Sequence, residues 1–167
     1  MKAMKKILAF ALAGVMALAL LTGCGTGGSA SHKSIAKAMA DYDNGHEGKT
    51  TITYTSSAEL DAQLQSLAAK PGFETVVKAV YSGTLSSSGI SFGDVLAGKV
   101  VRLYCGKYDK DAGKQAINLN AHSDYISTSK NMADERQIGL ITTSFTDADG
   151  EKVKVRFAVV VSDPVTP

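Results

Sequence analysis

The chain has 167 residues, of which 44% are hydrophobic and 20% are charged, and its formal net charge is +2. This length allows one independent hydrophobic core and is short for a solute-binding protein built from two lobes. A net charge so close to neutral gives no support for nucleic-acid binding.

The first 24 residues have the pattern of an export signal. Three lysines precede an uncharged apolar run over 7–21, which is shorter than the ~20 residues that a membrane-spanning helix needs. Its end, Leu21-Thr22-Gly23-Cys24, resembles the lipobox of a bacterial lipoprotein precursor. The resemblance implies cleavage before Cys24 and acylation of its thiol, which would anchor the protein to the extracytoplasmic face of the bacterial cell membrane. An ordinary cleaved secretory signal is the alternative.

We predict three segments: a signal peptide over 1–23, a flexible tether over 24–31 and one globular domain over 32–167. The tether is rich in Gly, Ser, Thr and Ala, a composition typical of flexible linkers. Loss of the signal leaves 15 basic and 16 acidic residues, so we expect no polybasic contact with anionic lipid. Cys105 is then the only cysteine besides Cys24, so packing rather than an internal disulfide must stabilise the domain.

In the first half of the domain, apolar residues at helical spacing predict a short helix that ends near 43–45. A short strand is predicted over 50–55. Ser56 and Glu59 then form a capping-box pattern that opens a second helix, which ends before Pro71. The predicted buried face of this second helix consists of Leu60, Leu64 and Leu67.

The next segment, 73–86, has apolar residues at helical spacing but many β-branched side chains, so helix and strand both stay open. Residues 86–89 are predicted to form a loop, and 92–96 a single helical turn.

The second half predicts two β-hairpins. The first pairs 99–108 with 114–126, and the second pairs 138–146 with 152–162. The resulting fold class is α+β, with a mostly antiparallel sheet of four to six strands and the N-terminal helices packed on one face. A small open β-barrel is the alternative.

The common catalytic and metal-binding patterns are missing from this sequence. The Asp-rich segments 109–113 and 147–151 lack the full calcium-loop pattern and are predicted to be turns. The histidines are scattered without zinc-ligand spacing, and Cys105 alternates with apolar residues, which predicts a buried, unreactive thiol. We therefore predict no catalytic residue, no metal and no cofactor.

The first predicted hairpin carries the candidate ligand-binding residues. If its apolar side chains face the core, period-2 alternation places six polar and aromatic side chains on the opposite face. Tyrosine rings beside directional hydrogen-bonding groups suit a sugar, a peptide or a protein surface. A merely solvated sheet face is the alternative. The six residues are Arg102, Tyr104, Tyr108, Asn118, Asn120 and His122.

Together these observations predict a non-enzymatic lipoprotein, tethered to the membrane through Cys24, that binds a ligand or an envelope protein outside the cytoplasm. A structural or accessory subunit of an envelope or transporter complex is the first alternative. An enzyme acting on cell-wall or extracellular material is the second. Nucleic acid is not an expected partner.

Overall fold

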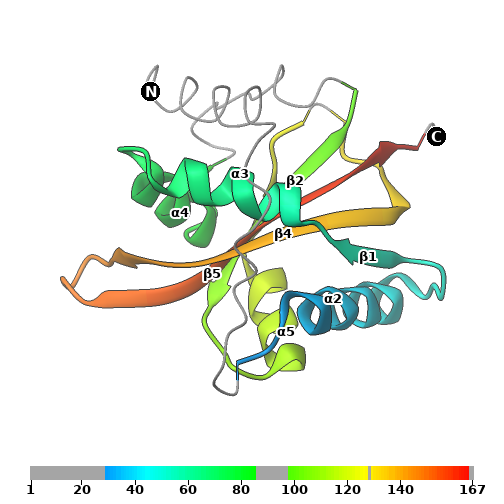
Figure 1. Cartoon of the computed structure of the whole chain (residues 1–167), viewed down its shortest axis with the longest axis horizontal. Helices are drawn as coiled ribbons and strands as arrows, with labels where there is room; N and C mark the ends of the chain where they lie inside the picture. Colours follow the sequence, from blue (N-terminus) through cyan, green and yellow to red (C-terminus); the bar gives the residue numbers. More distant parts are fainter. Residues whose placement is uncertain (1–28, 86–97, 128, 166–167) are drawn as a thin grey trace.

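Two helical layers enclose one five-stranded sheet in the computed structural model, which describes residues 29–85, 98–127 and 129–165 (Figure 1). The described helices are α2 (His32–Glu47), α3 (Ala58–Ala68), α4 (Phe73–Tyr81) and α5 (Ala112–Ala121). The described strands are β1 (Thr53–Ser56), β2 (Val100–Lys107), β3 (Ser123–Tyr125), β4 (Met132–Thr146) and β5 (Lys152–Pro164). The predicted α+β class is confirmed, and the sheet is not closed into a barrel.

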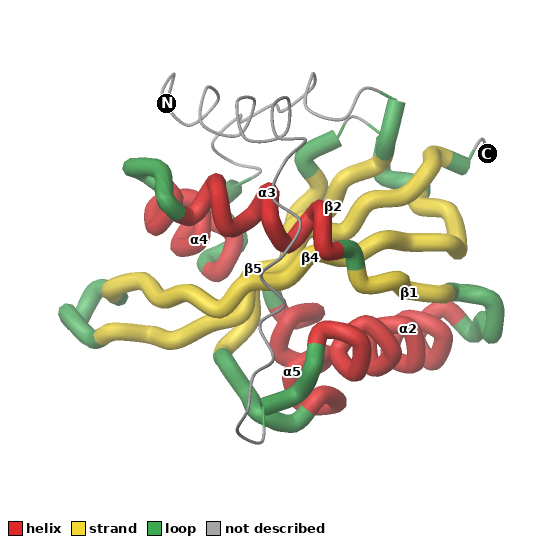
Figure 2. The backbone as a smooth tube through the Cα atoms, viewed as in Figure 1, coloured by secondary structure: helices red, strands yellow, loops and turns green. Residues whose placement is uncertain are grey.

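The strand order across the sheet is β1-β4-β5-β2-β3 (Figure 2). β1 runs parallel to β4, while the other three pairings are antiparallel. The sheet is therefore mixed, whereas the sequence predicts a mostly antiparallel one. The parallel pairing was not visible in the sequence because a long stretch of chain separates β1 from β4.

The helices cover both faces of the sheet, in contrast to the predicted single helical layer. α3 and α4 pack on one face, and α2 and α5 pack on the other (Figure 1). The central strand β5 explains the difference, because both of its faces are apolar. Val155, Phe157 and Val159 belong to the core under α3 and α4, whereas Ala158 and Val160 belong to the core under α2 and α5. A strand buried on both faces requires a layer on each side.

The first helix, α2, extends beyond its predicted end at 43–45. It continues to Glu47 and ends at Gly48, which has a φ of +63°. Helices commonly end at a residue in the left-handed conformation. Glycine adopts this conformation easily because it has no Cβ atom to clash with the backbone.

The second helix, α3, confirms the predicted buried face of Leu60, Leu64 and Leu67. Its cap is Ser57 rather than the predicted Ser56, which ends β1; the Ser57 hydroxyl accepts a hydrogen bond from the Leu60 amide at 3.2 Å. The segment that the sequence left open is helical as far as Tyr81, since it forms α4. The loop predicted at 86–89 and the turn predicted at 92–96 lie outside the described residues.

The predicted second hairpin is confirmed by the antiparallel pairing of β4 with β5. Its Asp-rich connection is a turn that Asp147 holds. The Asp147 Oδ1 atom accepts hydrogen bonds from the amides of Asp149 at 3.0 Å and Glu151 at 2.8 Å. Gly150 takes a positive φ of 84°.

The predicted first hairpin is wrong, because most of 114–126 belongs to helix α5. Asp111 caps this helix by accepting a hydrogen bond from the Lys114 amide at 2.9 Å. Ala116 and Leu119 are buried at helical spacing, whereas Ile117 is 57% exposed. The alternation that suggested a strand was therefore accidental, and the capping aspartate was the better signal.

Two glycines let helices lie directly on the sheet. A Cβ atom at Gly106 of β2 would collide with the backbone of Asn118 in α5. A Cβ atom at Gly139 of β4 would collide with Leu60 in α3. These two contacts set the distance of α5 and of α3 from the sheet.

Candidate binding cleft

The six side chains of the predicted hairpin face do not form one surface. Tyr104 is fully buried in the core beneath α2 and α5. Burial raises its pKa to about 12, although nearby Arg102 partly opposes the shift. Tyr108 follows β2, and its hydroxyl donates to Ser29 Oγ at 2.9 Å.

The three candidates from the second half of that hairpin have local roles in the α5 region. The side-chain amide of Asn118 donates to the Lys107 carbonyl at 3.0 Å, and that of Asn120 donates to the Ala116 carbonyl at 3.0 Å. The ring of His122 stacks on Tyr81 with a centroid separation of 4.5 Å. These contacts support packing, so only Arg102 of the six reaches a cleft that the structure describes.

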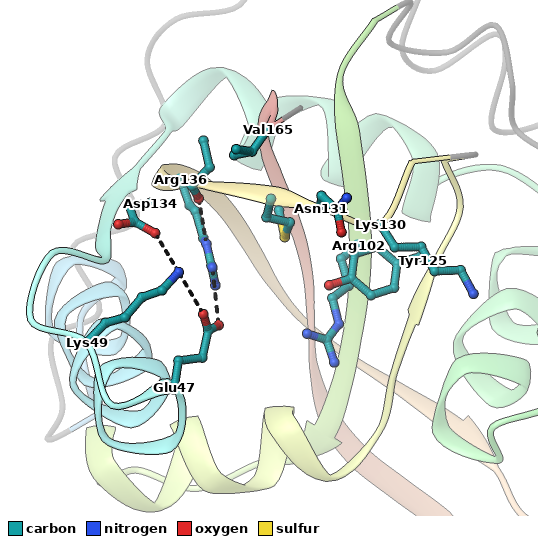
Figure 3. Close-up of a pocket in the computed structure, with 11 residues that line it drawn as sticks. Glu47, Lys49, Arg102, Tyr125, Lys130, Asn131, Asp134, Arg136 and Val165 are labelled. Carbon is teal, nitrogen blue, oxygen red and sulfur yellow. Dashed lines mark hydrogen bonds and ion pairs between the residues drawn. The ribbon is translucent and has the colours of Figure 1, made fainter. Parts of the chain in front are cut away.

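This cleft lies at the sheet end where β4 begins and has a volume of about 640 Å³. Its walls come from the end of α2, the α2–β1 connection and the start of β4 on one side, and from β2, β3 and the β3–β4 connection on the other (Figure 3). Apolar atoms of Met132, Ala133 and Val165 complete the lining. The charged and polar lining residues are Glu47, Lys49, Arg102, Tyr125, Lys130, Asn131, Asp134 and Arg136.

Arg136 anchors the first wall. Its side chain is only 4% exposed, and its Nη1 atom pairs with Asp43 Oδ2 at 2.6 Å. Its Nη2 atom lies 3.3 Å from Glu47 Oε1, and the Tyr54 hydroxyl donates to the same Asp43 oxygen at 2.7 Å. Burial disfavours the charged guanidinium, but Tyr54, Asp43 and Glu47 outweigh it, so the pKa of Arg136 is raised. The group is a fixed cation.

A bulge in β4 places Arg136 there. The pairing register with β5 shifts between Met132 and Arg136, and Arg136 Nε donates to the Ala133 carbonyl at 3.0 Å. The freed amide of Ala133 donates to Ser162 Oγ at 3.1 Å. Bulges re-aim side chains in this way.

Lys49 neutralises the carboxylates at the rim of the same wall. Its Nζ atom lies 3.1 Å from Glu47 Oε2 and 3.1 Å from Asp134 Oδ1. The hydrogen bonds to Asp134 and Glu47 raise the pKa of Lys49. Hydrogen bonds from Thr51 and Lys49 lower the pKa of Asp134. Both carboxylates therefore already have a cationic partner.

The second wall presents Arg102 between two aromatic rings. Its guanidinium carbon lies 4.8 Å from the ring centroid of Tyr104 and 4.8 Å from that of Tyr125. The Nε and Nη2 atoms donate to Ser123 Oγ at 3.1 and 2.6 Å. In the part of the chain that the structure describes, no carboxylate pairs with this guanidinium. Among the described residues, this wall therefore carries positive charge without a counter-ion, and the exposed Lys130 adds to it.

Sequence reasoning found Arg102 but missed the rest of the cleft. Tyr125 was placed in the wrong hairpin, and Arg136 preceded the predicted strand at 138. The only local signal for the cleft was the polar segment 130–136 before a long apolar strand. Whether this segment lines a cleft depends on the pairing of β4 with β1 and on the bulge in β4.

The two acidic side chains of the cleft lining, Glu47 and Asp134, are paired with cations. Cys105 lies outside the cleft, in the core, where burial raises the pKa of its thiol to about 12. Within 29–85, 98–127 and 129–165, no three His, Cys, Asp or Glu side chains are grouped to hold a metal ion.

None of the described helices combines the length and the hydropathy that crossing a membrane requires. Comparisons with protein-family models, with curated proteins and with solved structures gave no significant match.

Proposed function

We propose that this protein is a non-enzymatic, lipid-anchored protein of the bacterial envelope whose domain binds a ligand outside the cytoplasm, in the cleft at the start of β4. The lipobox resemblance of Leu21-Thr22-Gly23-Cys24 supports the anchor. The observation that carries the binding role is the cleft itself, which has one wall braced by Arg136 and another that presents Arg102.

Both walls are preorganised, which favours ligand binding. Arg136 is held by Asp43 and Glu47 beneath the first wall, and Arg102 is held between Tyr104 and Tyr125 in the second. Side chains that are already fixed lose little conformational entropy when a ligand arrives. The cleft has a volume of about 640 Å³ and is lined mostly by polar and charged side chains, so the ligand that it suits is a small polar one.

The accessory-subunit alternative would need an exposed strand edge or an apolar patch. The edge strands β1 and β3 have four and three residues. The large exposed hydrophobic residues in the described ranges are Ile117 and Val165. We therefore argue for the cleft, which has a defined geometry.

Thermal melting tests this proposal. The full chain, purified from membranes in detergent, is melted with neutral sugars, cell-wall fragments, short peptides, carboxylates and phosphates. A ligand present at about 100 times its dissociation constant adds about 2.7 kcal/mol, or several degrees of melting temperature. A reproducible shift supports a binding function, whereas a flat panel counts against it.

A cleft-filling variant and a matched control locate the binding. Asn131→Trp introduces a bulky ring at the cleft without changing the charge, and Asn131 is exposed, so the core is spared. Ile117→Trp introduces the same ring on the exposed side of α5. The proposal predicts that Asn131→Trp loses the ligand-dependent shift and Ile117→Trp keeps it. Equal shifts in both variants would place the binding elsewhere.

A further inference from the structure

We propose that the cleft recognises an oxyanion, a carboxylate or phosphate group, through the free edge of the Arg102 guanidinium. This inference rests on the proposed function, since it assigns the chemical class of ligand to the same cleft. It follows from the hydrogen bonds of Arg102, from its aromatic neighbours and from the distribution of charge between the walls.

The hydrogen bonds that Arg102 makes with other described residues leave one of its two bidentate edges open. A guanidinium can offer a side edge, made of Nε and Nη2, or an end edge, made of Nη1 and Nη2. The Ser123 hydroxyl occupies the side edge, since it accepts from both Nε and Nη2. The end edge retains two parallel N–H donors, which match the two oxygens of a carboxylate or phosphate.

The aromatic neighbours fix the plane of that edge. Tyr104 is fully buried and cannot move easily, and Tyr125 packs near the same guanidinium. Cation–π contacts on a planar guanidinium orient it as well as stabilise it. In Figure 3, Arg102 extends from β2 into the space between the two walls of the cleft. The donors are therefore presented to a ligand in a fixed orientation.

The charge of the two walls favours an anion beside Arg102. On the first wall, the three carboxylates of Asp43, Glu47 and Asp134 share two cations, Lys49 and Arg136, so this wall does not attract an anion. On the second wall, Arg102 and Lys130 have no ion pair within the described residues. A partly desolvated cation without a counter-ion attracts an anion more strongly than a solvated surface lysine does.

Matched pairs of probes test the inference and distinguish the two oxyanions. Glucose 6-phosphate is compared with glucose, and N-acetyl-alanyl-alanine is compared with its C-terminal amide. Each pair differs in the anionic group that Arg102 would bind. Affinities are measured for the full chain in detergent at low and at moderate salt.

The expected result is that at least one anionic probe binds, that its neutral counterpart binds at least 10-fold more weakly, and that added salt weakens the binding. Arg102→Gln should reduce the affinity for that anion about 10- to 100-fold, because it removes a charge-assisted bidentate contact. Arg102→Lys should recover only part of the loss, because lysine restores the charge without the planar fork. Lys99→Gln, which removes an exposed cation outside the cleft lining, should bind as the wild type does.

Three results would overturn the inference. Neutral probes that bind as well as their anions would show that the cleft works without oxyanion recognition, and the proposed function would stand. Failure of both anions to bind would also overturn the oxyanion inference. The wider melting panel then shows separately whether the proposed binding function fails as well. Equal affinities of Arg102→Gln and the wild type for an anion would place that anion at another site.

Discussion

Arg136 on β4 and Asp43 on α2 are 93 positions apart in the sequence, and their side chains form a buried ion pair with 2.6 Å between Nη1 and Oδ2. The pair joins helix α2 to the sheet next to the cleft, and Tyr54 adds a hydrogen bond to the same carboxylate. Because both charges are buried, each depends on the other for compensation.

This pairing predicts a large and non-additive effect on stability. Arg136→Met should lower the free energy of unfolding by about 3–5 kcal/mol, because it leaves Asp43 without its buried cation. Asp43→Asn/Arg136→Met should cost clearly less than the sum of its two single variants. Denaturant unfolding near neutral pH measures all three. Effects that simply add would contradict the coupling.

The close approach of α5 to β2 predicts opposite effects of two glycine substitutions. Gly106→Ala should destabilise the domain by about 1–3 kcal/mol, because its new Cβ atom would press on the backbone of α5. Gly113→Ala, in the first turn of α5, meets only Asp111 Oδ1 at an ordinary distance of 3.4 Å. It should leave stability unchanged or raise it by up to about 1 kcal/mol. A tolerated Gly106→Ala would show that the helix sits farther from the sheet.

Burial of Cys105 predicts an unreactive thiol in the folded domain. Its pKa is raised to about 12 from an ordinary value of 9.0, so at pH 8 almost no thiolate is present and reagents cannot reach the sulfur. In the Cys24→Ser chain, a disulfide reagent such as DTNB should label no thiol before unfolding and one thiol after it. Rapid labelling of the folded chain would contradict the burial.

The same shift fixes the sign of a pH effect on stability. The thiol of Cys105 ionises near 9 when unfolded and near 12 when folded. Its contribution is therefore complete below pH 9 and is lost as the pH rises towards 12. Comparing the wild type with Cys105→Ala between pH 8 and pH 11 measures this contribution. The free energy of unfolding of the wild type should fall relative to that of Cys105→Ala as the pH rises. A rise of the wild type relative to the variant would contradict the prediction.

The proposed anchor predicts that Cys24 decides where the protein resides. Cys24→Ser should abolish incorporation of radiolabelled palmitate and shift the protein from the membrane fraction to the soluble fraction. Cys105→Ala, which alters the other cysteine, should leave both unchanged. Retention of Cys24→Ser on membranes through a detergent-sensitive association would contradict lipid anchoring.

The sequence predicted the parts of the fold that have one apolar face or a strict alternation. Leu60, Leu64 and Leu67 identified α3, and the β-patterned run over 152–162 identified β5. The prediction failed in α5, where Ile117 and Leu119 have the spacing of a strand although the segment is a helix. Asp111, which caps that helix, was taken for a turn residue. Local patterns of this kind are decided by tertiary packing.

The candidate site was predictable only in part, for a different physical reason. The sequence named Arg102 only as one of six residues on the face of a predicted hairpin, and that hairpin is wrong. The setting of Arg102 between Tyr104 and Tyr125 requires the pairing of β2 with β3, and the opposite wall requires the parallel pairing of β1 with β4. Neither pairing can be predicted from a local sequence pattern, because strand pairing depends on contacts between distant segments.

The most direct test of ligand binding in the cleft is a ¹⁵N NMR titration of the full chain with the compound that gives the largest melting shift. If the ligand binds in the cleft, the Arg102 Nε–H signal and the Asn131 side-chain amide signals should move together and saturate at one dissociation constant. The backbone amide of Ile117 should stay unchanged. Saturable changes confined to α3, α4 or the exposed side of α5, with Arg102 and Asn131 unmoved, would contradict the account.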